Sequence, residues 1–265
     1  MSVGKSILEG SVVSRNAAPR MPVNSTVVLK GKMNGKSAMI GLDEDLLSKQ
    51  MLLVGGTGCG KSTLFYHMIR QLKDKMTDDD VMIIFDTKGD FYSRFFDSSR
   101  DYVIGNSSQY YEESERWNIF KEIVADGWED KQVILNVQEI CKAFFEERVK
   151  KSNNIFFPNA ARDLLAAILV TIVRLGADSK EFVRKIFYND RFKEYLDSSS
   201  GEKLCELLEG YPDMRSVLSY IKGNNQQSQG VLAEMYSVVR DIFIGVFNEK
   251  GGFSLRNFEI GRAHV

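Results

Sequence analysis

The sequence predicts an α/β fold in which a mostly parallel sheet is interrupted by an inserted all-α domain. Three observations predict it. A short apolar run, Met51–Val54, stops at a glycine-rich turn, and a helical pattern follows from Lys61. A second apolar run, Val81–Phe85, has the continuous β-type composition of a buried parallel strand. From about Gln132 onward the apolar residues recur at helical spacing.

Composition is that of an ordinary water-soluble protein. The chain has 265 residues, of which 43% are hydrophobic, enough for a sizeable core, and its net charge of −1 argues against general coating of nucleic acid. Three widely spaced cysteines favour neither a disulfide framework nor a zinc site, and they fit a reducing cytoplasm. The longest apolar run, Leu164–Val173, is far shorter than the ~20 residues of a spanning helix.

The N-terminal part, residues 1–36, is predicted to be a flexible basic arm with one strand at Ser25–Leu29. The first forty residues carry six basic residues against one acid. Such an arm is suited to phosphates or an anionic membrane, but the composition favours the alternative of a solvated flexible leader. Residues 37–130 are assigned to the first part of the sheet domain, which opens with a strand at Ala38–Leu42 and an acidic turn at Asp43–Asp45.

Further elements follow from the same periodicity. A helix is expected at Lys61–Lys75, a turn at Asp78–Asp80 and a third strand at Tyr102–Ile104. Residues 131–250 are assigned to the all-α domain, whose segment Asn159–Leu175 is apolar almost all round and is predicted to be its central buried helix. The remaining helices are expected along the apolar stripe from Val133 to Phe145, at Glu181–Tyr188, Glu202–Leu208 and Met214–Ile221, and along the apolar stripe from Val231 to Phe247.

The glycine-rich turn matches a phosphate-binding pattern. Gly55, Gly60, Lys61 and Ser62 fit G-x-x-x-x-G-K-S/T without a mismatch. The glycines allow consecutive backbone N–H groups to surround a polyphosphate, and the following helix directs its positive end at the same anion. Lys61 is suited to reach the outer phosphates, and the Ser62 hydroxyl is suited to hold Mg²⁺.

Three segments resemble those of one family. Ile83–Tyr92 resembles the D-P-K-G-D/E segment of type IV coupling proteins, the conjugative DNA-transfer ATPases allied to FtsK- and HerA-type translocases, with Thr87 where proline is usual. Arg116–Ile123 resembles the W-N-P/I-F/L stretch that follows, and Phe157–Ala166 is similar to the start of the family's all-α domain. The resemblance covers about residues 36–258.

The resemblance implies a P-loop NTPase sheet of the RecA/FtsK type, with ATP and Mg²⁺ as cofactors. It implies a hexameric motor at the inner face of the cell membrane that moves single-stranded DNA or relaxase–DNA complexes into a secretion channel. Lys61 would be the catalytic residue and Ser62 the Mg²⁺ ligand. The nucleotide-binding residues would be Gly55, Gly56, Thr57, Gly58, Cys59, Gly60, Lys61, Ser62, Thr63, Asp86 and Lys88.

Two other classes of function stay open. One is a non-motor P-loop nucleotide-binding protein, although the guanine-specific N-K-x-D motif is not found. The other is a chain that binds nucleotide or partners without turnover. Asp86 has an alternative interpretation as a turn acid at the end of a strand. The all-α domain is expected to carry contacts to DNA or to a transfer partner rather than to ATP. Its polar segment Asn224–Gln229 supports this expectation, and the alternative is that the segment is just a loop.

The C-terminal residues suggest an interrupted chain. Residues 251–259 resemble a return toward the sheet, and residues 260–265 are what a common sequencing-adapter string encodes. The family's Asp-Glu pair at the end of a later strand has no counterpart, and neither do the membrane-spanning helices of many coupling proteins. Membrane association is therefore expected only through partners or missing segments.

We expect this chain to bind nucleotide weakly, to hydrolyse ATP at most at the background rate, and to aggregate or stay partly molten. Phosphoryl transfer to water requires an acid near the metal and a residue that orients the water, and neither is identified here. A malachite-green phosphate assay with and without single-stranded DNA measures the turnover. Robust, DNA-stimulated hydrolysis by the 265-residue chain would contradict this expectation.

Overall fold

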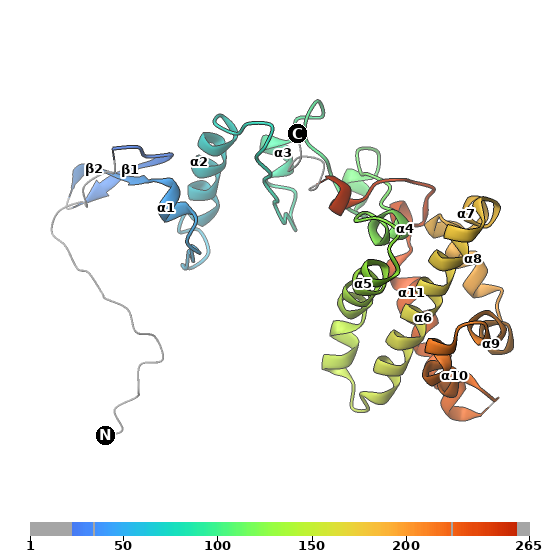
Figure 1. Ribbon diagram of the computed structural model, residues 1–265. Coiled ribbons are helices and arrows are strands. Elements are labelled where there is room, and N and C mark those ends of the chain that lie inside the picture. The colour runs from blue at the N-terminus through green and yellow to red at the C-terminus, as the bar shows by residue number, and fades with distance from the viewer. Residues whose placement is uncertain (1–22, 34, 224, 259–265) are drawn as a thin grey trace, which may run out of the picture. The chain divides into compact units, whose positions relative to one another are not determined.

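The computed structural model describes residues 23–33, 35–223 and 225–258 (Figure 1). The chain divides into two compact units, Met1–Phe96 and Asp97–Val265. Most of the predicted basic arm and the adapter-like residues 260–265 lie outside the described residues. Each unit is described by itself below.

The first unit contains an antiparallel hairpin. Strand β1 (Val27–Met33) pairs with β2 (Lys36–Leu42), with Val27 opposite Leu42 and Met33 opposite Lys36. Gly35, at φ +78°, provides the left-handed turn residue between them. The strand predicted at Ala38–Leu42 is therefore confirmed and begins two residues earlier, at Lys36. The strand predicted at Ser25–Leu29 is confirmed in part, because β1 begins at Val27 and continues to Met33.

Two helices follow the hairpin. The predicted acidic turn is a one-turn helix, α1 (Glu44–Leu47), which begins because the Asp43 carboxylate accepts the Leu46 N–H at 2.9 Å. Helix α2 (Lys61–Lys73) confirms the predicted phosphate-loop helix. Its Gln71 side chain forms two hydrogen bonds with the backbone of β1: Oε1 accepts the Val28 N–H at 2.8 Å, and Nε2 donates to the Val28 carbonyl at 3.1 Å. The helix is thereby fixed to the edge of β1.

Two of the predicted strands are not strands in the structure. Met51–Val54 and Val81–Phe85 lack ladder pairing, and Leu52 and Phe85 are 86% and 92% exposed. A strand requires a neighbour to satisfy its backbone N–H and C=O groups, and apolar composition specifies burial without specifying that neighbour. Within the described residues the sheet is the hairpin alone, so a parallel P-loop sheet is not shown.

The second unit is helical, as predicted. Of the third expected strand, Tyr102–Ile104, one bridge remains, between Val103 and Ser114. The helices are η1 (Ser108–Tyr110), α4 (Ile119–Ile123), α5 (Asp130–Lys151), α6 (Phe156–Asp178), α7 (Lys180–Ile186), α8 (Asn189–Asp197), α9 (Gly201–Glu209), η2 (Pro212–Met214), α10 (Arg215–Ile221), α11 (Gln226–Ile242) and η3 (Gly245–Asn248). The sequence did not predict α8, although its buried Phe192 and Leu196 have the i, i+4 spacing of a helix face.

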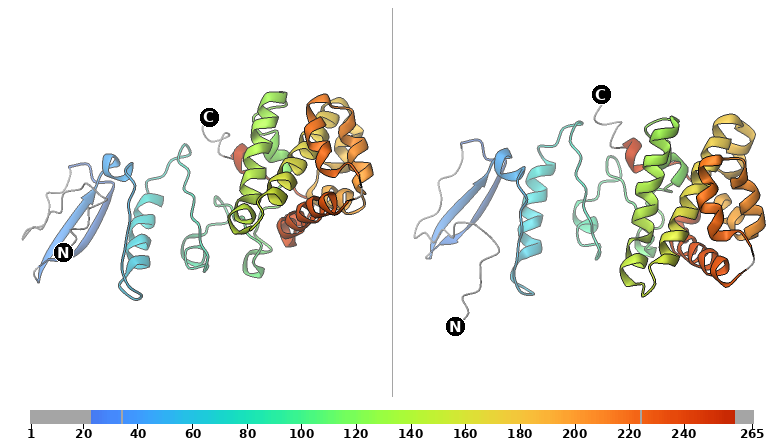
Figure 2. Two further views of the ribbon diagram at one scale, coloured as in Figure 1. Left: turned by 90° about the horizontal axis from the view of Figure 1, so that it is seen from below. Right: turned by 60° about the horizontal axis from the view of Figure 1, so that its bottom comes forward.

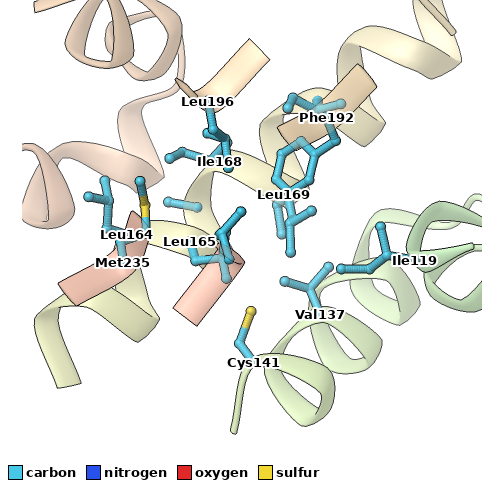
Figure 3. Close-up of a cluster of buried hydrophobic side chains, with 14 of the residues drawn as sticks. Ile119, Val137, Cys141, Leu164, Leu165, Ile168, Leu169, Phe192, Leu196 and Met235 are labelled. Atoms are coloured by element: carbon cyan, nitrogen blue, oxygen red, sulfur yellow. The ribbon is translucent and has the colours of Figure 1, made fainter. Parts of the chain in front are cut away.

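Helix α6 is the centre of this unit, as its apolar composition predicted. Figures 1 and 2 show α5 and α6 side by side and antiparallel, and α11 also packs on α6. In Figure 3 the α6 side chains Leu165 and Leu169 lie among side chains from α4, α5, α8 and α11. Among the described helices, α6 buries the most residues. Since a fully buried leucine stabilises the fold by about 1.5–3 kcal/mol, α6 makes a large contribution to the apolar stabilisation of this unit.

Two buried asparagines, Asn118 and Asn189, connect distant segments of the chain near the two ends of the helical unit. Asn118 caps α4, with Oδ1 accepting the Phe120 and Lys121 N–H groups, and its Nδ2 donates to the carbonyls of Phe187 (3.0 Å) and Gly251 (2.9 Å). Both asparagines are 1% exposed.

The second asparagine, Asn189, begins α8. Its Oδ1 accepts the Ile119 N–H at 3.0 Å, and its Nδ2 donates to the carbonyls of Trp117 (2.7 Å) and Phe247 (2.9 Å). Buried polar groups are stable only when they are hydrogen-bonded, so the two amides fix three chain segments in one geometry.

The segment after η3 returns to the same place. Phe253 forms a parallel bridge with Trp117, in which Asn118 N donates to the Phe253 carbonyl at 2.9 Å. Glu122, 7% exposed, accepts the N–H groups of Leu255 (2.8 Å) and Arg256 (3.1 Å). The helical unit therefore begins and ends at neighbouring positions, as expected of an inserted domain.

Gly251 makes this return possible. A Cβ at this position would lie 2.1 Å from the Arg116 carbonyl oxygen, a backbone atom that cannot move aside. A Cβ at the neighbouring Gly252 would meet nothing within 4 Å.

We expect Gly251→Ala to lower the free energy of unfolding by about 1–3 kcal/mol, the usual cost of forcing extra volume into a packed site. Gly252→Ala is the matched control, and we expect it to be neutral or slightly stabilising. Urea unfolding followed by circular dichroism measures both. Equal stabilities of the two variants would show that the close approach at Gly251 does not constrain the fold.

Candidate nucleotide-binding site

The predicted phosphate loop has the backbone that its glycines specify. Gly58 and Gly60 adopt left-handed conformations, at φ +79° and +89°, which glycine takes without steric cost. Gly60 is the N-cap of α2, and the first turn of the helix contains no acidic residue. The N-terminal N–H groups and the positive end of the helix dipole are thus available to an anion.

Lys61 folds back over the loop. Its Nζ donates to the carbonyl oxygens of Gly55 and Gly56, both at 2.7 Å, and lies 3.8 Å from the Sγ of Cys59. The ammonium group therefore lies beside the backbone that the sequence motif assigns to phosphate. A phosphate oxygen would compete with these two carbonyls for the same donors, and the interaction would gain from the opposite charge.

Gly55 lies close to the Cys59 side chain, a contact that the motif alone did not reveal. A Cβ on this residue would lie 2.4 Å from the Sγ of Cys59, across the loop. The loop thus closes tightly between its first glycine and Cys59. Gly56, Thr57, Ser62 and Thr63 are exposed around it, where a ligand can reach them.

Magnesium would depend on Ser62 and on the phosphates themselves. Among the residues that the structure describes, no group of three histidine, cysteine, aspartate or glutamate side chains is placed to hold a metal ion. Mg²⁺ commonly binds through few protein ligands, together with water and substrate phosphates. An exposed hydroxyl in the first turn of α2, beside a loop suited to polyphosphate, is compatible with that kind of site.

The Asp86 carboxylate accepts backbone hydrogen bonds from the loop that follows it. Its Oδ1 accepts the N–H groups of Lys88 (3.3 Å) and Gly89 (3.0 Å), and its Oδ2 accepts those of Phe91 (2.8 Å) and Tyr92 (3.0 Å). Partial burial raises the pKa of Asp86, but these four backbone donors lower it more, so the net pKa is below its ordinary value. These contacts are those of a turn acid; a role of Asp86 and the exposed Lys88 toward nucleotide stays a prediction.

Aromatic packing holds the Asp86 segment against α2. The Tyr66 ring lies 5.3 Å from Phe91 in an edge-on arrangement, and the Arg94 guanidinium lies 4.5 Å above the Tyr66 ring. Lys73 Nζ donates to the Phe95 carbonyl at 2.6 Å. Helix α3 (Tyr92–Phe95) is thereby fixed to the helix that starts at Lys61. Sequence reasoning missed Tyr66 and Arg94, whose contacts depend on the fold of both segments.

Comparison with known families identifies the chain. A family model described as the type IV secretion-system coupling protein DNA-binding domain matches residues 35–262. The match covers most of the chain, so this protein belongs to the type IV secretion-system coupling protein family, and the resemblance seen in the sequence is confirmed. Membership supports a role in conjugative DNA transfer. No curated protein and no solved structure matches the chain significantly.

In the described part of the chain, no helix has both the length and the hydropathy that crossing a membrane requires.

We expect Asp86→Ala to release the loop that follows it. The amides of Gly89, Phe91 and Tyr92 should then exchange with deuterium faster, while Asp90→Ala, a change of an exposed acid in the same loop, should leave them protected. Hydrogen-exchange mass spectrometry measures both.

The same interaction sets a pH dependence. Because the folded-state pKa of Asp86 lies below the ordinary value of 3.8, its stabilisation is present above that pH and is lost as the pH falls through the lower folded value. If Asp86→Ala left the hydrogen-exchange protection of the loop amides unchanged, the result would contradict the role of the carboxylate.

Proposed function

We propose that this chain is the ATP-binding motor domain of a conjugative coupling protein, which couples ATP hydrolysis to DNA movement in the complete protein. One observation carries the proposal: a single family match, to a coupling-protein DNA-binding domain, spans both the phosphate loop and the helical unit. The glycine geometry and the cationic side chain of the loop support nucleotide binding at Gly55–Thr63.

Each loop residue has a defined chemical task in this proposal. The backbone N–H groups of the glycine turn and of the first turn of α2 bind phosphate oxygens. Lys61 leaves its two carbonyl acceptors and forms charge-assisted hydrogen bonds to the outer phosphates. The Ser62 hydroxyl helps to hold Mg²⁺, which when bound neutralises charge on the phosphates.

The proposed partners follow from the family. They are single-stranded DNA and relaxase–DNA complexes as cargo, other copies of the chain in a homo-hexamer, and components of the secretion channel at the inner face of the cell membrane. ATP turnover by the complete protein belongs to the same proposal. The helical unit is the proposed site of DNA or relaxase contacts, because the matched family model is that of a DNA-binding domain.

We expect Lys61→Ala to reduce Mg-ATP binding below detection, since it removes the charge-assisted contacts to phosphate. Ser62→Ala should weaken binding more in the presence of Mg²⁺ than in its absence. Lys131→Ala, a change of an exposed lysine on α5, is the control and should bind as the native chain does. Titration calorimetry with ATP, with and without Mg²⁺, measures all three.

The outcomes separate the candidate functions. ATP affinity that Lys61→Ala leaves unchanged would refute the site, and equal losses of Ser62→Ala in both conditions would refute the metal role. Specific binding of a nucleotide other than ATP would favour a non-motor P-loop protein. Nucleotide binding without any affinity for single-stranded DNA would remove the motor assignment.

A further inference from the structure

A surface pocket lies at one end of the helical unit. It is formed where the turn between α5 and α6 meets the turn between α10 and α11, both at the lower end of the bundle in Figure 1. Its volume is about 580 Å³, within the ~300–1,000 Å³ range of small-molecule sites. The residues that line it are Asn154, Phe156, Phe157, Asn225, Gln226 and Gln227.

Two helices begin at this pocket. Helix α6 starts at Phe156 and α11 starts at Gln226, and both residues belong to the pocket wall. Asn154 Oδ1 accepts the Phe156 N–H at 3.1 Å, and Asn225 forms a capping box with Ser228. The N–H groups of Asn159 and Gln229 already donate to the carbonyls of Ile155 (3.2 Å) and Asn225 (3.1 Å). In the first turns, the N–H groups of Phe157, Gln226 and Gln227 come before the point at which a helix supplies its own carbonyl acceptors. Two positive helix ends at one pocket favour an anion.

Contacts with neighbouring residues fix the two aromatic side chains of the pocket wall, Phe156 and Phe157. Phe156 meets Phe157 edge-on at 5.4 Å and Tyr220 at 5.9 Å with perpendicular rings. Phe157 in turn packs against Gly230 of α11, where a Cβ would lie 2.5 Å from its ring. Because Gly230 leaves room for that ring, the half-buried Phe156 is presented on a fixed support.

The rest of the lining is uncharged and polar. The side chains of Asn154, Asn225, Gln226 and Gln227 are exposed, and each carries an amide with both donor and acceptor capacity. None of the six lining residues is a carboxylate, so the wall itself does not repel phosphate. Asparagine and glutamine amides match the hydrogen-bonding edges of nucleobases.

We propose that this pocket holds one unstacked nucleotide of single-stranded DNA. The base lies against Phe156, the amides of Gln226 and Gln227 bind its edge, and its phosphate faces the first turns of α6 and α11. The proposal rests on the proposed function, since that function makes DNA the ligand. A base in a duplex is stacked and paired, so the pocket favours single strands, in which bases stack on aromatic side chains.

The test measures binding of a fluorescein-labelled, mixed-sequence oligodeoxynucleotide of about 16 nucleotides to the full chain by anisotropy. We expect Phe156→Leu, which keeps the apolar volume and removes the flat ring, to weaken binding about ten-fold. We expect the double variant Gln226→Ala/Gln227→Ala to weaken it by a similar factor. Gln138→Ala, a change of an exposed amide on α5, is the matched control and should bind as the native chain does.

A second measurement locates the contact directly and does not depend on a substitution. The same oligonucleotide containing 5-iododeoxyuridine is photo-crosslinked to the native chain, and the crosslinked peptides are mapped by mass spectrometry. Crosslinks at Asn154–Phe157 or Asn225–Gln227 support the proposal. Circular dichroism melting shows whether each variant keeps the native fold.

The possible results are distinguishable. Native-like binding by folded Phe156→Leu and Gln226→Ala/Gln227→Ala proteins, with crosslinks elsewhere, overturns the pocket and leaves the proposed function intact. Tighter binding of duplex than of single-stranded DNA overturns the single-nucleotide arrangement. Absence of any DNA binding by the native chain contradicts both the pocket and the proposed function, and would direct the search to a protein partner.

Discussion

The arrangement of the helical unit depends on the hydrogen bonds that two buried asparagines, Asn118 and Asn189, form with the backbone. Each is buried and satisfied at both ends of its amide, and together they fix the chain around Trp117, the end of α7 and the segment after α11. Loss of either amide would leave several backbone groups buried without partners, at about 1–3 kcal/mol each. The apolar core supplies most of the stabilising free energy, and these amides select one arrangement of it.

This arrangement also brings the beginning and the end of the helical unit together. The bridge between Trp117 and Phe253 places the beginning and the end of the unit side by side, and Glu122 holds the returning segment through two of its backbone N–H groups. Trp117 itself packs among aromatic rings of α5 and of the segment after α11, and its indole N–H reaches Glu122. The motif that suggested the family in the sequence therefore has a structural task, which is to join the two ends of an insertion.

Both candidate binding sites lie at helix N-termini that face solvent. The residues around these N-termini differ between the two sites. At α2 the glycines leave the backbone N–H groups open to an anion, and the Lys61 side chain supplies a positive charge. At α6 and α11 the wall is built from amides and an aromatic ring, which suit a base as well as its phosphate. The first arrangement suits a polyphosphate, and the second suits one nucleotide within a strand.

The sequence by itself determined the local features: the glycine-rich turn and the helix after it, the family, the hairpin strands and most helices of the all-α unit, α4 and α8 excepted, because short-range spacing encodes each of them. It also indicated a polar segment near Asn225. It failed at Met51–Val54 and Val81–Phe85, where a strand depends on neighbours that local composition does not specify. Only the tertiary structure placed the buried amides of Asn118 and Asn189, the close approach at Gly251 and the pocket between α6 and α11, because each arises from residues far apart in the chain that meet only when the core has packed.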